Sequence, residues 1–130
     1  MNIEQMIEIY PQRPHLVILG AGASKDAMPD GDAEGRPLPV MNEFISTLGL
    51  TDYIGRIEGV PKTDNIEDVY SWLANQEQFA EERFVVENEI REYFSNITLP
   101  DTLTKYDLLV LSLRQKDCIA TFNWDGLLVQ

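Results

Sequence analysis

The sequence predicts an α/β fold, in which a Rossmann-like parallel sheet is combined with many helices in an incomplete, helix-rich domain. Two short runs of β-branched and leucine residues, at 15–19 and 118–122, lie about a hundred residues apart, and each passes directly into a glycine-rich or polar motif. Between these runs, apolar residues recur every three or four positions, which is the spacing of helices with one buried face.

The first predicted strand, residues 15–19, ends in the sequence GAGAS at residues 20–24. Gly20 permits a sharp exit from the strand and Gly22 lets the main chain approach a ligand, because neither carries a Cβ atom. Ser24 supplies a hydroxyl where a helix can begin. A buried strand followed by such a turn is typical of a backbone cradle for an anionic group such as phosphate. The dinucleotide pattern G-x-G-x-x-G and the P-loop pattern are both absent, so an ordinary strand-to-helix turn fits these residues equally well.

A proline-rich segment follows the glycine motif. Residues 26–39 hold three prolines, two glycines and four acids, which favour neither helix nor strand. The segment is longer than most connections, so it is either a lid over a ligand or a disordered loop, and its position favours the lid. Arg36, its only cation, either meets a phosphate or stays solvated.

Five helices with one apolar face are expected along the chain. The third is expected to begin at Asp64, with Glu67 three positions later in the arrangement of a capping box. Most of the pattern falls in a helical insert, at about residues 40–115, between the two strands. The expected apolar positions are Ile3, Met6, Ile7 and Tyr10; Met41, Phe44, Ile45 and Leu48; Ile66, Val69, Tyr70 and Leu73; Val86, Ile90, Tyr93 and Ile97; and Tyr106, Leu109, Val110 and Leu113.

The second predicted strand, residues 118–122, ends in polar side chains interleaved with two aromatic residues. The polar residues are Thr121, Asn123 and Asp125. Ligands of open α/β sheets bind outside the carboxyl ends of the strands. We therefore expect the two strands to lie parallel and side by side, so that both motifs share one ligand.

Together, GAGAS at 20–24 and TFNWD at 121–125 resemble the two signature motifs of the sirtuin superfamily, GAGxS and TxN[IYW]D. The aromatic residue before the aspartate, and the helical insert, are closer to the sirtuin-like NAD hydrolases of bacterial anti-phage defence than to the deacylases. The resemblance implies that residues 1–130 are the amino-terminal part of a sirtuin-like NAD-binding domain. The implied activity is hydrolysis of NAD, as substrate, to ADP-ribose and nicotinamide in anti-phage defence.

The resemblance also implies roles for single residues. Asn123 would bind near the nicotinamide ribose and help position the attacking water or acyl oxygen, and Asp125 would read the nicotinamide carboxamide, which makes these two the implied catalytic residues. Thr121 would support the side of the site that Asn123 and Asp125 form. The resemblance implies that Ala21, Gly22 and Ser24 contact the NAD pyrophosphate, and Gly20 in the same turn is counted with the cofactor-binding residues.

The chain departs from the family pattern at two places. Deacylases follow the glycine motif with a loop ending in Pro-Asp-Phe-Arg, whereas here Pro29 and Asp30 are followed by Gly31 and Asp32. The family's general base is a histidine downstream of the second motif, but the only histidine is His15, about 16 Å along the first strand from its ligand-facing end. The 130-residue chain alone is therefore expected to be inactive.

Other functions stay open: a non-catalytic module that binds or senses a nucleotide, an NAD-dependent protein deacylase, and a structural or interaction role without a nucleotide, which is favoured only if the two motifs do not converge. The four cysteines of the deacylase zinc module are missing, and no metal site is predicted. Cys118, the single cysteine, is expected to pack as a small hydrophobic residue inside its strand.

Charge and hydropathy bear on partners. With 22 acidic and 10 basic residues, the chain repels the phosphate backbone and is not expected to bind nucleic acid directly. The absence of a signal-peptide pattern and of a membrane-length apolar segment favours a cytoplasmic protein with no membrane partner. An unpaired strand edge and the apolar run that begins at residue 127 lead us to expect a homo-oligomer or a fused downstream domain.

Overall fold

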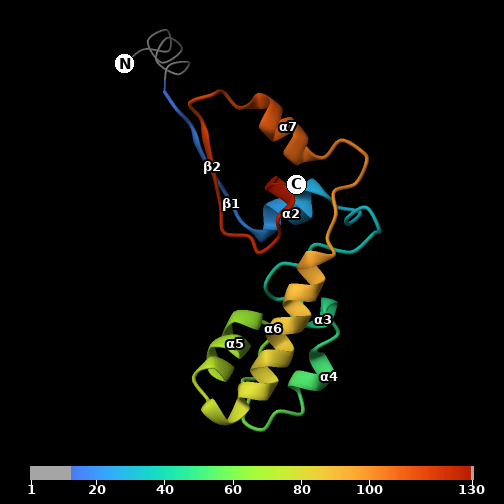
Figure 1. Ribbon diagram of the computed structural model, residues 1–130, viewed down its shortest axis with the longest axis vertical. Coiled ribbons are helices and arrows are strands. Elements are labelled where there is room, and N and C mark those ends of the chain that lie inside the picture. Colours follow the sequence, from blue (N-terminus) through green and yellow to red (C-terminus); the bar gives the residue numbers. More distant parts are fainter. Residues whose placement is uncertain (1–12, 130) are drawn as a thin grey trace.

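The computed structural model describes residues 13–129 and shows a mixed α/β, helix-rich chain (Figure 1). Strands β1 (Leu16–Leu19) and β2 (Cys118–Thr121) form a parallel sheet, which is two-stranded within the described residues. Leu16 pairs with Cys118 and Leu19 with Thr121, so the strands are in register along their whole length. The predicted parallel pairing is confirmed, and both motifs leave the same edge of the sheet.

Helices fill the chain between the strands, as the apolar spacing predicts. The first predicted helix, with Ile3, Met6, Ile7 and Tyr10, lies outside the described residues. The elements in chain order are α2 (Ala21–Ala27), α3 (Phe44–Thr47), α4 (Thr51–Ile54), α5 (Ile66–Ala74), the 3-10 helix η2 (Glu77–Phe79), α6 (Ala80–Ser95), α7 (Lys105–Ser112) and, after β2, the 3-10 helix η3 (Leu127–Val129).

Two apolar cores organise these elements. Helices α3, α4, α5 and α6 share the first core, in which Ile66, Val69, Leu73 and Val86 are fully buried. The second core joins α2, the following loop, the end of α6, α7 and η3; its buried members are Ala27, Met28, Leu38, Ile97, Tyr106 and Leu127. Phe94 of α6 packs against both cores. In Figure 1 the helices α3, α4, α5 and α6 lie in the lower part of the molecule, and α2 and α7 lie beside the sheet.

The helix boundaries correct two expectations. The helix predicted around Met41 to Leu48 is only the single turn of α3, because Gly49 follows with a φ of +69°, a left-handed conformation that interrupts the helix. Helix α5 does not begin with a capping box at Asp64. Asn65 is its N-cap, and the Asn65 side chain accepts a 2.9 Å hydrogen bond from the Glu67 N–H.

A capping box does occur, at the start of α7. The Thr104 side chain accepts a hydrogen bond from the Asp107 N–H, and the Asp107 carboxylate accepts one from the Thr104 N–H at 2.7 Å. On the same helix, Val110 is exposed although the spacing predicts it on the buried face. Within the described residues, α7 meets the rest of the chain chiefly through Tyr106 and Leu109.

The sheet is less buried than the sequence predicts. Leu16 and Ile18 of β1 are 62% and 63% exposed, and Cys118 of β2 is exposed as well. The expectation that Cys118 packs as a small hydrophobic residue inside its strand is therefore wrong for this structure. The physical reason is that nothing among residues 13–129 covers this face of the two-stranded sheet.

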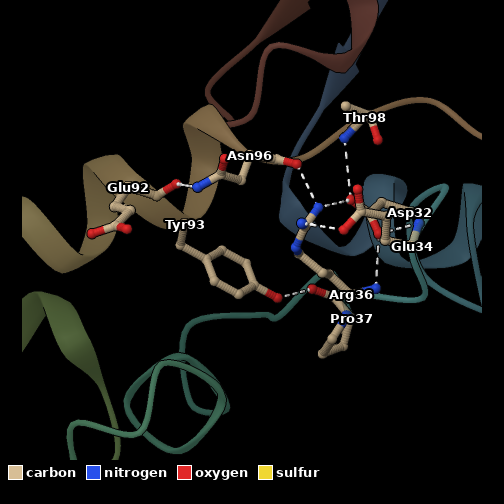
Figure 2. A network of polar contacts seen from close by, with 8 residues as sticks. All are labelled: Asp32, Glu34, Arg36, Pro37, Glu92, Tyr93, Asn96 and Thr98. Atoms are coloured by element: carbon tan, nitrogen blue, oxygen red, sulfur yellow. Dashed lines mark hydrogen bonds and ion pairs between the residues drawn. The ribbon is translucent and has the colours of Figure 1, made fainter.

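The loop after α2 is anchored instead of free. The Asp32 side chain is fully buried, and Figure 2 shows its carboxylate between Arg36 and Thr98. It accepts hydrogen bonds from the N–H groups of Glu34, Arg36 and Thr98 at 3.0, 2.8 and 3.2 Å, and one from the Arg36 guanidinium at 2.9 Å. Burial alone would raise the Asp32 pKa, but these donors hold it below its ordinary value.

Arg36 is thus engaged within the loop. Besides Asp32, its guanidinium bonds Glu34 and, at 2.6 Å, the carbonyl oxygen of Asn96 at the end of α6 (Figure 2). Tyr93 of α6 donates a further hydrogen bond to the Pro37 carbonyl. The segment predicted as a lid or a disordered loop is therefore tied to α6, and its first residues, to Ala27, belong to α2.

At the opposite end of the sheet, His15 belongs to a small polar cluster. The Asp117 carboxylate accepts hydrogen bonds from the His15 N–H at 2.8 Å and from the Arg114 N–H at 2.9 Å. The Arg114 guanidinium also bonds it at 3.1 Å, and these contacts hold the Asp117 pKa well below its ordinary value. The His15 ring lies 2.8 Å from Arg114 and is half-exposed, far from the edge that carries both motifs.

Candidate functional site

A pocket of about 210 Å³ lies where both motifs leave the sheet. Its lining includes five of the seven residues that the sequence singles out, which are Gly20, Ala21, Ser24, Asn123 and Asp125. The other two lie beside it. Gly22 is exposed on α2, and the Thr121 hydroxyl accepts a 3.1 Å hydrogen bond from the Asn123 N–H. The two motifs therefore converge, and Thr121 supports the backbone turn that presents Asn123.

Ser24 is the point at which the two motifs meet. Its hydroxyl donates a 2.8 Å hydrogen bond to Asp125 Oδ2, accepts one of 2.8 Å from Asn123 Nδ2, and lies 2.6 Å from the Tyr106 hydroxyl. A serine hydroxyl carries one proton, which here goes to Asp125, so Tyr106 must be the donor in the third bond. Ser24 is only 1% exposed and has no bonding capacity left for a ligand. Its role in this structure is to hold the site together.

The glycine motif itself folds differently from the expectation. Helix α2 begins at Ala21 with Gly20 as its N-cap, so Ser24 lies within the helix and not at its start. This places the Ser24 side chain one turn into α2, facing inward toward Tyr106 and Asn123. A Cβ atom added at Gly20 or Gly22 would meet no other atom within 4 Å. The space over this turn is therefore open to a ligand.

Asn123 presents an unused acceptor. Its Oδ1 atom is buried and has no hydrogen-bond partner, which is the one such side-chain atom among the described residues. The orientation of the amide follows from Ser24, because the only Ser24 proton is committed to Asp125 and the Asn123 NH₂ group must therefore face Ser24. Buried polar atoms without a partner are rare and costly in folded proteins. A ligand hydroxyl or amide that donates to Asn123 Oδ1 would satisfy it.

Asp125 uses both carboxylate oxygens. Oδ2 accepts the hydrogen bond from Ser24, and Oδ1 accepts one of 3.3 Å from the Leu127 N–H. The second bond caps the start of η3 and fixes the chain after the motif. Asp125 still lines the pocket, with lone pairs on each oxygen that these single bonds leave open.

Tyr106 is a member of the site that sequence reasoning missed. Helical spacing assigns it to the apolar face of α7, and it is indeed buried, but its hydroxyl ends at Ser24. Burial raises the Tyr106 pKa, and the negative charge of Asp125 adds to this, so the tyrosine stays protonated as a donor. A phenol on an otherwise apolar helix face was the signal that could have identified it, because a buried tyrosine hydroxyl needs a partner.

Aromatic side chains from the helical insert form part of the pocket. Trp124 stands edge-on to Phe44 with ring centroids 5.7 Å apart, and edge-on to Phe94 at 6.5 Å. Phe44 and Phe94 contact each other at 5.4 Å. Phe122, the other aromatic of the second motif, lines the pocket and is 79% exposed. The aromatic residues of TFNWD therefore connect the sheet edge to the insert.

The charges of the pocket are negative only. Among residues 13–129, its ionisable lining residues are Asp125 and Glu67, the latter from the first turn of α5, and no lysine, arginine or histidine of that range lines it. The loop after α2 adds the apolar residues Leu38 and Pro39. Aromatic faces and carboxylates both favour positive charge in a bound ring. The sequence marks Glu67 only as an expected capping-box residue, and its place at the pocket follows from the packing of α5.

Within residues 13–129, no group of three or more His, Cys, Asp or Glu side chains is arranged to hold a metal ion. Among the same residues, no helix combines the length and the apolar character needed to cross a membrane. No protein-family model, curated protein or solved structure matches the chain.

Proposed function

We propose that this chain binds NAD at the pocket and takes part in cleaving the bond between nicotinamide and ribose, releasing nicotinamide and ADP-ribose. The single observation that carries the proposal is the pair of hydrogen bonds from Ser24, in the glycine motif, to Asn123 and Asp125 in the second motif. These bonds join at one pocket the two motifs that resemble those of sirtuin-like proteins. The finer assignment, a Rossmann-like sheet of the sirtuin type acting in anti-phage defence, belongs to the same proposal.

The lining of the pocket suits one end of NAD. Ligand cavities of roughly 300 to 1,000 Å³ are usual for drug-sized molecules, and this one is smaller. It fits a single ring with its sugar better than a whole dinucleotide. The oxidised nicotinamide ring is a cation, and a lining of carboxylates and aromatic faces favours a cation. The phosphates then lie outside the pocket, over the open backbone of the turn at Gly20 and Gly22.

Each polar group has a defined part in this proposal. Asn123 Oδ1 accepts a hydrogen bond from a ribose hydroxyl, which supplies the partner that it lacks. The nicotinamide carboxamide donates a hydrogen bond to Asp125, which lines the pocket. As the glycosidic bond breaks, positive charge moves onto the ribose, and the carboxylates of the pocket stabilise that charge. Holding ribose and ring in a fixed orientation lowers the barrier further.

A second function has one observation in its favour. His15, the only histidine of the sequence, lies at the end of the sheet away from the pocket and cannot act as the family's base. A module that binds NAD or ADP-ribose and does not turn it over would keep the pocket and need no base. The deacylase alternative gains no support of this kind.

Calorimetric titration of NAD and ADP-ribose, together with a nicotinamide-release assay, tests the proposal. The wild-type protein is expected to bind both ligands, and Asn123→Ala to lower nicotinamide release at least about a hundredfold while changing NAD affinity only a few-fold. Asn75→Ala, at an exposed helix end, is the matched control and should leave both unchanged. Binding without release in the wild type would favour the sensing module, and absence of binding would refute both functions.

A further inference from the structure

Glu67 is the carboxylate of the pocket whose oxygens make no hydrogen bond within the described part of the chain. It lines the pocket from the first turn of α5 and is exposed. Among the described residues, its side chain makes no hydrogen bond or ion pair, whereas both oxygens of Asp125 accept hydrogen bonds from Ser24 and Leu127. Of the two carboxylates, Glu67 is therefore the one with its full bonding capacity open to a ligand.

The backbone that carries Glu67 is held firmly. The Glu67 N–H donates to the Asn65 side chain at 2.9 Å, which caps α5. The preceding residue, Ile66, and Val69 one turn later are both fully buried in the first core. The Glu67 carboxylate is thus open to a ligand while the Glu67 backbone is fixed. A group that acts on a substrate needs such a fixed position.

The first core also connects Glu67 to the second motif. Phe44 belongs to the same buried cluster as Ile66, and the ring of Trp124 packs edge-on against Phe44 at 5.7 Å. Trp124 stands directly between Asn123 and Asp125 in the sequence. The packing that places the insert therefore sets the position of Glu67 relative to the two implied catalytic residues.

We infer that Glu67 is the general base for NAD hydrolysis, an inference that rests on the proposed function. Glu67 would take the role that a histidine has in the family that the motifs resemble. Water attacks C1′ of the nicotinamide ribose, and its proton passes to the Glu67 carboxylate and then to solvent. A bond forms between the water oxygen and C1′, while the bond between C1′ and the ring nitrogen breaks. The electron pair of the broken bond neutralises the nicotinamide ring. NAD and water thus yield ADP-ribose, nicotinamide and one proton.

This inference reverses the expectation that the chain is inactive for want of a base. It also gives the helical insert a chemical role, because the acid–base group comes from α5 and the binding groups come from α2 and the residues after β2. The hydrolase would then be complete only when the insert is packed against the second motif.

The test measures nicotinamide release and NAD binding for Glu67→Gln and Glu67→Ala, with Asp68→Asn as the control. Asp68 is exposed on the same turn but does not line the pocket. We expect both Glu67 variants to lose about a hundredfold to ten-thousandfold in nicotinamide release, while NAD affinity changes only a few-fold. Sodium azide should restore release in Glu67→Ala and give azido-ADP-ribose, because azide attacks C1′ without losing a proton. A purely structural role of Glu67 would not respond to azide.

The outcomes separate the two claims. If the wild type is active and the Glu67→Gln variant keeps its nicotinamide release within about threefold of it, Glu67 is not the general base. The proposal of NAD hydrolysis is then retained. Failure of azide to restore release in a Glu67→Ala protein that still binds NAD also overturns it. A wild type that binds NAD without releasing nicotinamide refutes the base and leaves the sensing module. A wild type that does not bind NAD removes the proposed function and this inference together.

Discussion

The hydroxyl of Ser24 donates a 2.8 Å hydrogen bond to Oδ2 of Asp125, across 101 positions of the sequence. The Ser24 hydroxyl oxygen also accepts hydrogen bonds from the Asn123 amide and from the Tyr106 hydroxyl, so this one buried atom joins side chains from three parts of the chain. A network in which every bond of the central hydroxyl is used fixes the orientation of its members. It is the element that sets the geometry of the pocket.

Ser24→Ala is expected to destabilise the protein by about 2 to 4 kcal/mol, because it leaves the Asn123 amide and the Tyr106 hydroxyl without their buried partner. Urea unfolding, followed by circular dichroism, measures the change. Ser46→Ala is the matched control, since its exposed hydroxyl donates a single bond to the Glu43 carbonyl, and it should cost less than about 0.5 kcal/mol. Equal losses in the two variants would show that the network contributes little.

Tyr106→Phe should lower the free energy of unfolding by about 1 kcal/mol. It should also make the free energy of unfolding fall less steeply with pH in the alkaline range. Burial raises the Tyr106 pKa in the folded state, so the unfolded tyrosine ionises first as the pH rises. The contribution that the raised Tyr106 pKa makes to the free energy of unfolding is thus fully present below a pH of about 10 and is lost as the pH rises above it. Urea unfolding between pH 8 and 11 measures this, and the variant should lose less stability above pH 10 than the wild type does. An identical slope would place the Tyr106 pKa at its ordinary value.

Asp32→Asn is expected to release the loop after α2. The substitution puts an NH₂ group where four donors now meet a carboxylate, at a cost of about 2 to 4 kcal/mol. The Asp32 pKa is lower in the folded state, so its contribution is present above pH of about 4 and is lost as the pH falls further. Limited proteolysis should then cut the variant near Gly35, and NAD affinity should fall because Leu38 and Pro39 line the pocket. Glu34→Gln, at an exposed position of the same loop, is the control.

The sequence predicts the elements that local patterns determine. Two short runs of β-branched and leucine residues, with the polar ends that follow them, are sufficient to predict the parallel pairing of β1 with β2, because the motifs must share an edge to share a ligand. The spacing of Ile66, Val69 and Leu73 likewise predicts α5 and its buried face. Such patterns repeat within a few residues and therefore need no knowledge of distant packing.

Other features depend on which distant parts of the chain meet. Glu67 lines the pocket because the first core packs against Trp124, and its neighbourhood in the sequence marks it only as an expected helix-capping residue. Cys118 is exposed because its face of the sheet is uncovered within the described residues, which the apolar run alone does not reveal. The four bonds to Asp32 turn an apparently flexible loop into an anchored one, and they join residues as far apart as 66 positions. The NAD assignment itself stays a prediction.

The two glycines of the first motif should behave differently on substitution. Gly20 lines the pocket in an extended conformation that any residue adopts, and a Cβ there meets no protein atom, so Gly20→Val should fold and lose NAD binding at least tenfold. Gly22 lies within α2 and beside the pocket. Gly22→Ala should stabilise the fold by about 0.5 to 1 kcal/mol, because glycine weakens a helix. Calorimetry and urea unfolding report both, and normal NAD binding by a folded Gly20→Val protein would contradict the proposed position of the ligand.

Amide chemical-shift mapping of the 130-residue protein with NAD shows whether both motifs form one NAD site. We expect saturable shifts that cluster at residues 20–24, 121–125 and Glu67, with little change near His15 at the other end of the sheet. A second cavity of about 580 Å³, lined by α4 and residues 55–64, holds neither motif and serves as an internal reference. Shifts confined to that cavity, or no shifts at millimolar NAD, would contradict the account.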